Sequence, residues 1–110
     1  MSASASEETV KRVAIDYAAS GNNEIVAAVP GKIIRVINLA IHSGGTVLVR
    51  FESGAGGTAL TGQMAFNGVV SSLVPGESMQ GHFQTVVGES LNMELSAAIS
   101  VDGWLCYQEV

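Results

Sequence analysis

Apolar and polar residues alternate with a period of two along most of this chain, which is the pattern of β-strands with one buried face. Val47, Val49 and Phe51 occupy alternate positions of one such run. The same alternation recurs in residues 12–17 and 91–96. No stretch keeps the three- and four-residue spacing of apolar positions that an amphipathic helix needs, so the pattern predicts an all-β protein.

Turn-forming dipeptides divide the alternating runs. They stand at positions 30–31, 44–45, 67–68, 75–76 and 102–103. Pro-Gly pairs end strands, whereas Gly-Gly, Asn-Gly and Asp-Gly pairs favour tight hairpins. Turn signals about every 8 to 12 residues are typical of a sandwich or barrel. We therefore predict an antiparallel two-sheet β-sandwich, jelly-roll-like, with about eight short strands.

The predicted sandwich is a single domain over residues 10–110, and residues 1–9 are small, polar and without strand alternation. Such a terminus is expected to be a flexible arm. The core expected between the two sheets consists of one face of the last strand together with Val13, Ile15, Ile33, Ile37, Leu39, Val47, Val49, Phe51, Leu91, Met93 and Leu95.

The run from Ile33 to Ile41 departs from simple alternation, because apolar residues occupy both its odd and its even positions. The run from Trp104 to Tyr107 shows the same excess. One face of each strand enters the core, and a monomer rarely leaves a second large apolar face bare. The sequence therefore predicts a symmetric homo-oligomer. Its candidate interface residues are Ile34, Val36, Trp104, Leu105 and Tyr107.

Charge and composition exclude several classes of partner. Ten acidic residues against five basic ones give a net charge of −5, and the basic residues are scattered, so no phosphate-binding patch for nucleic acid is expected. No window holds the ~20 consecutive apolar residues of a membrane helix. The first residues lack the basic and apolar regions of a secretory signal.

Candidate chemistry is sparse. His42, His82 and the single Cys106 have no neighbours at metal-ligand spacing, so no metal or other cofactor is expected. The glycine-rich stretch 54–62 lacks the Lys-Ser/Thr ending of a phosphate loop, and no nucleophile elbow is present. The alternative is a small sandwich enzyme or sugar-binding module that would use Glu77, Glu89 or Asp102. We expect a protein that is not an enzyme.

Four segments also carry a family likeness. They read "PGKxIRV" at residues 30–36, "FxSG…LTG" at 51–62, "FxTxxGExLxxxLS" at 83–96 and "VxGxLxYxEV" at 101–110. In these segments the sequence resembles a group of small tailed-bacteriophage virion proteins. Trp104 and Cys106 depart from the group, which more often has smaller or plainer residues there.

The resemblance implies a non-enzymatic capsid decoration or cement protein that forms a trimer, binds the major capsid protein on the outside of the virion and is made in the bacterial host cytoplasm. It transfers no functional residue. The polar arm would supply the capsid contacts, for which the candidates are Ser2, Ser4, Ser6, Glu7 and Glu8. The alternative within the same class is a tail or head-fibre domain that binds a host surface receptor.

Overall fold

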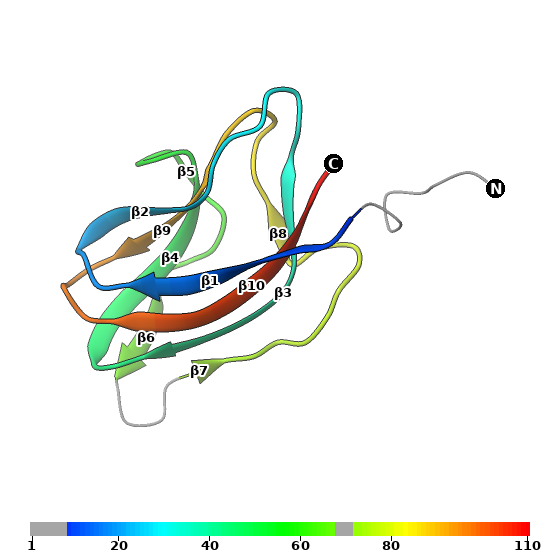
Figure 1. Ribbon diagram of the computed structural model, residues 1–110. Coiled ribbons are helices and arrows are strands. Elements are labelled where there is room, and N and C mark those ends of the chain that lie inside the picture. Colours follow the sequence, from blue (N-terminus) through cyan, green and yellow to red (C-terminus); the bar gives the residue numbers. More distant parts are fainter. Residues whose placement is uncertain (1–8, 68–71) are drawn as a thin grey trace.

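The computed structural model describes residues 9–67 and 72–110, and this part of the chain forms ten β-strands and no helix (Figure 1). The first sheet consists of β1 (Lys11–Tyr17), β3 (Ile34–Ser43), β7 (Ser72–Leu73), β8 (Phe83–Gln84) and β10 (Val101–Glu109). The second sheet consists of β2 (Gly21–Val26), β4 (Thr46–Ser53), β5 (Thr58–Ala59), β6 (Met64–Asn67) and β9 (Leu91–Leu95). Within these ranges no helix has the length and hydropathy to cross a bilayer.

All strand pairs are antiparallel, and their order is nested. The first sheet runs β1-β10-β3-β7 with β8 also paired to β3, and the second runs β2-β9-β4-β5 with β6 also paired to β4. Strands from the first half of the chain therefore pair in reverse order with strands from the second half, as in a jelly roll. The predicted fold class is confirmed. The strands exceed the expected number because β3 and β4 each have two short partners instead of one longer strand.

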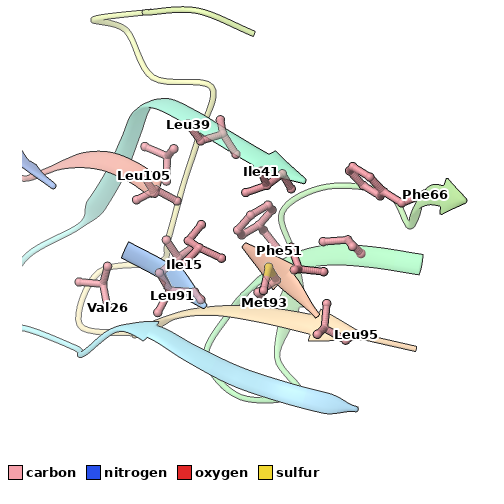
Figure 2. Close-up of a cluster of buried hydrophobic side chains, with 14 of the residues drawn as sticks. Ile15, Val26, Leu39, Ile41, Phe51, Phe66, Leu91, Met93, Leu95 and Leu105 are labelled. Atoms are coloured by element: carbon pink, nitrogen blue, oxygen red, sulfur yellow. The ribbon is translucent and has the colours of Figure 1, made fainter. Parts of the chain in front are cut away.

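The core lies between the two sheets, where side chains of both layers meet (Figure 2). Its labelled members in Figure 2 are Ile15, Leu39, Ile41 and Leu105 from the first sheet and Val26, Phe51, Phe66, Leu91, Met93 and Leu95 from the second. The ring of Phe51 packs on that of Phe83 in the opposite sheet, with 5.0 Å between centroids. Burying each of these side chains contributes roughly 1.5–3 kcal/mol, so this layer is the main source of stability.

Three residues of the expected core lie elsewhere. Val13 is half-buried at the margin of the cluster, and Ile33 is half-buried just before β3 begins. Ile37 is buried, but it does not belong to the cluster between the sheets. The pattern therefore predicted the centre of the core correctly and its borders less well.

A β-bulge at Ile37 explains why this part of the chain does not alternate. Asn38 pairs with Cys106 and Val36 pairs with Tyr107, so β3 has one residue more than β10 opposite it. An extra residue in one strand shifts its alternation by one position. The residues of β3 that face the interior therefore have even numbers before Ile37 and odd numbers after it.

The bulge overturns part of the interface prediction. Ile34 and Val36 face the interior before the bulge, and Leu39 and Ile41 face it afterwards. Ile34, Val36 and Leu105 are each 0% exposed within the single chain, so no second copy can reach them. The apolar residues at even and at odd positions of β3 line one interior surface, and they do not require a partner to cover them.

The predicted turns have mixed outcomes. The Gly-Gly pair joins β3 to β4, as expected, and Gly31 has the positive φ of a turn, 75°. The Asp-Gly pair at 102–103 was wrongly predicted as a hairpin, because it lies inside β10. The arm candidates Ser2, Ser4, Ser6, Glu7 and Glu8 and the second residue of the Asn-Gly pair lie outside the described residues.

Candidate interaction surface

Three long strands of the first sheet, β1, β10 and β3, lie side by side and share one outer face (Figure 1). Leu105 points into the core, so the adjacent Trp104 points outward. In the register of the sheet, Trp104 lies between Ala14 on β1 and Ala40 on β3. We call this surface the Trp104 face, and it comprises Arg12, Ala14, Asp16, Asn38, Ala40, His42, Asp102, Trp104 and Cys106.

One end of the Trp104 face carries two carboxylates and a histidine. Asp16 pairs with Asp102, and Asp102 pairs with His42, so the three form one row across β1, β10 and β3. All three are exposed. Desolvation, followed by the hydrogen bond and the repulsion from Asp16, raises the pKa of Asp102, while His42 acts in the opposite direction. This end of the face therefore holds more negative charge than its surroundings neutralise.

The other end carries basic side chains. Arg12 is exposed on β1 in the row of Cys106, and Arg35 lies further along β3, beyond the bulge. The Nε atom of Arg35 donates a hydrogen bond to Oε1 of Gln84 at 3.2 Å. Neither arginine forms an ion pair with another described residue. The Trp104 face is thus acidic at one end, apolar in the middle and basic at the other end.

Of the five predicted interface residues, the structure brings Trp104 alone to an outer face. Tyr107 pairs with Val36 and Lys11 on the inner side of the sheet, where it is half-buried against the core. Ile34, Val36 and Leu105 are interior, as described above. The predicted residues therefore do not form one surface.

Ser53 and Glu89, from two of the resembling segments, meet at one end of the sandwich. Ser53 Oγ donates a hydrogen bond to Glu89 Oε1 at 2.7 Å and accepts one from Val86 N at 2.8 Å. The N–H of Gly54 donates to the carbonyl oxygen of Ser90 at 2.8 Å. Ser53 itself is 0% exposed. This network fastens the end of β4 to the segment between β8 and β9.

Thr85 fastens the same segment to the other sheet. The N–H of Ile34 donates to Thr85 Oγ1 at 2.9 Å, and the N–H of Thr85 donates back to the carbonyl oxygen of Ile34 at 3.0 Å. The N–H of Gly88 donates to the carbonyl oxygen of Lys32 at 2.8 Å. These side chains hold three chain segments together, and their hydrogen-bonding groups serve the fold.

The second sheet carries a charge network on its outer face, in which Glu52 is buried and Arg50 and Glu94 are partly exposed. Arg50 forms ion pairs with Glu52, which is 0% exposed, and with Glu94, where Nη2 lies 2.8 Å from Oε1. The glycine-rich stretch 54–62 begins with a turn at residues 54–57 and then contains β5, with no helix that would present its N-terminus to a phosphate. The network joins neighbouring positions of β4 and β9 through Arg50, and the buried Oε1 atom of Glu52 has no hydrogen-bond partner among the described residues.

The residues proposed for an enzyme or sugar-binding alternative do not converge. Glu89 lies at the Ser53 end of the sandwich, whereas Asp102 lies at the His42 end. Within the described ranges, no group of three histidine, cysteine or acidic side chains is placed to hold a metal ion. His82 instead uses Nε2 in a hydrogen bond to the carbonyl oxygen of Gly76 at 2.6 Å.

A pocket of about 250 Å³ lies beside the start of β1. Its lining consists of Thr9, Lys11, Val29, Lys32 and Glu109. Lys11 Nζ lies 2.7 Å from Glu109 Oε1, and this hydrogen bond raises the pKa of Lys11. The pocket therefore contains an ion pair that is already satisfied within the chain.

No protein-family model and no curated protein matches this sequence. The likeness to phage virion proteins therefore depends on the four sequence segments alone. The row of Asp16, Asp102 and His42 was missed by sequence reasoning because its members come from distant strands. The alternation of the first run, in which Asp16 points away from Val13 and Ile15, was a signal for one member of this row, Asp16.

Proposed function

We propose that this chain is a non-enzymatic structural subunit of a tailed-phage virion, a decoration or cement protein that binds the outer surface of the capsid. The observation that supports this function best is how the resembling segments use their polar residues. Ser53, Thr85 and Glu89 join chain segments to one another. A likeness concentrated in residues of this kind points to a shared scaffold and not to shared chemistry.

A cement protein needs a rigid body and many modest contacts, because repeated copies multiply weak binding to a lattice. The two-sheet core provides the rigid body. The expected partner is the major capsid protein, and neither a cofactor nor a nucleic acid is required. The proposed trimer depends on the resemblance alone, since Ile34, Val36 and Leu105 are occupied inside the chain.

The test is a count of copies in purified phage particles by quantitative mass spectrometry, combined with imaging of the particle. A decoration protein should be present in hundreds of copies and should lie over the capsid shell. A count from a few to a few dozen, with density at the tail or a head fibre, would favour the receptor-binding fibre domain. Absence from the particle would overturn both functions.

A further inference from the structure

We propose that the Trp104 face is a self-association surface, on which two copies of this chain pack about a two-fold axis along the row Ala14, Trp104 and Ala40. This inference goes beyond the proposed function and does not depend on it. Three properties of the face support it: an outward tryptophan between two small residues, Asp16 and Arg12 at its two ends without an ion pair to any described residue, and equal spacing of these two charges from the central row.

The spacing follows from the register of β1. Asp16 and Arg12 lie two residues on either side of Ala14 and point to the same side of the sheet. Each is therefore about 7 Å from the central row along the strand. A two-fold axis along that row turns one copy over and reverses its strands. Asp16 of each copy then lies opposite Arg12 of the other.

Neither Arg12 nor Asp16 forms an ion pair with another residue that the structure describes. Asp16 lies beside the like charge of Asp102. Apposition of two copies forms the Asp16–Arg12 pair at both ends at once, because an isologous contact makes every interaction twice, while Asp102 comes to lie opposite Cys106. A different partner would need the same charges at the same spacing, whereas a second copy has them by symmetry.

The centre of the contact is apolar and has room for the tryptophan. Trp104 is half-buried, and its cross-strand neighbours Ala14 and Ala40 carry single methyl groups. Tryptophan is enriched at the energetic centre of protein interfaces. In the proposed pair the two Trp104 side chains face each other across the axis, and the small side chains of Ala14 and Ala40 on either side leave room for them.

The size of the face sets the strength of the contact. Three strands spaced by about 4.8 Å, over about 20 Å of their length, cover roughly 300 Å² of surface. That places the contact among small, weak interfaces, with a dissociation constant on the order of 100 µM. Association should therefore show at high protein concentration and disappear on dilution.

The experiment is sedimentation velocity between about 5 and 500 µM, with the emission of Trp104, the single tryptophan, recorded in parallel. The wild-type protein should pass from monomer to dimer with a blue shift of the emission. Arg12→Asp and Asp16→Arg should each weaken dimerisation at least about tenfold, since each places two like-charged pairs opposite each other. The combined exchange of both residues should restore dimerisation, because opposite charges then face each other again.

The controls are Lys32→Asp and Glu24→Arg, which make the same charge changes away from the Trp104 face and should leave dimerisation unchanged. All four positions are exposed, so the variants should fold, and circular dichroism verifies this. The proposal is overturned by a wild-type protein that stays monomeric at the highest concentration. It is equally overturned by an assembly that resists the single reversals, such as a trimer through another surface, or by a combined exchange that fails to restore association.

Discussion

Gly103 lies inside β10 at a point where the sheet has no space for a side chain. Its φ is 150°, and a β-carbon built there would overlap the carbonyl oxygen of Ala40 on β3. Glycine within a strand often marks such a close approach of two backbones. This contact also explains why an Asp-Gly pair stands inside a strand here, because glycine lets the backbones of β10 and β3 approach each other closely.

Gly103→Ala should therefore destabilise the protein by about 2–4 kcal/mol, through strain at an unusual φ and a clash with the neighbouring backbone. The melting temperature should fall by roughly 10 °C or more in a domain of this size. Gly62→Ala is the matched control, because a β-carbon there would meet nothing within 4 Å. Equal melting temperatures for the two variants would show that the sheet adjusts at Gly103.

The pair of Asp16 and Asp102 makes a prediction about pH. Because the pKa of Asp102 is raised in the folded chain, this group favours folding at low pH and loses that contribution as the pH rises above about 4. Asp102→Asn should remove this loss, so at pH 7 the variant should be more stable than the wild type, by less than about 0.5 kcal/mol at so exposed a site. At pH 3 the two should be equal.

Urea unfolding followed across pH 3 to pH 7 measures the effect, at about one-unit intervals. Glu77→Gln, which removes a carboxylate in an exposed loop, serves as the control. A wild-type protein that gains stability relative to Asp102→Asn as the pH rises would reverse the sign and contradict the prediction.

At the scale of the element, β3 shows both what a hydrophobic pattern predicts and where it fails. The pattern correctly predicted a strand, its turn at the Gly-Gly pair and its place in the core. It assigned the wrong face to Ile34 and Val36, because parity alone cannot locate a bulge. The extra residue is visible only against β10, whose pairing with β3 is a long-range contact. Ile34 and Val36 were wrongly placed in the candidate interface for the same reason.

Deleting Ile37 tests this account of β3. Without the extra residue the strand alternates continuously, so either Ile34 and Val36 or Leu39 and Ile41 must turn out of the core. We expect loss of the cooperative unfolding transition and aggregation. Ile37→Val keeps the bulge and should cost about 0.5–1.5 kcal/mol. A deletion variant that unfolds cooperatively near the wild-type temperature would contradict the role of the bulge.

At the scale of the whole molecule, the fold was more predictable than the surface. Short alternating runs with regular turns nearly determine a sandwich, since few other architectures bury so many narrow apolar strips. The Trp104 face arises differently, from three strands that meet only when the sheet forms. Arg12, Asp16 and Trp104 were each visible in the sequence, but their common row and spacing depend on the pairing of β1 with β10.

The central place of β10 has a consequence for biosynthesis. This strand lies between β1 and β3, so β1 has no partner in its sheet, and β3 has partners on one edge only, until residues 101–109 have left the ribosome. The nascent chain must carry two unpaired strand edges through most of translation, and pairings between distant segments form slowly. Charged residues along β1, among them Lys11, Arg12 and Asp16, would then keep the unpaired edge of β1 from pairing with strands of other chains before β10 is made.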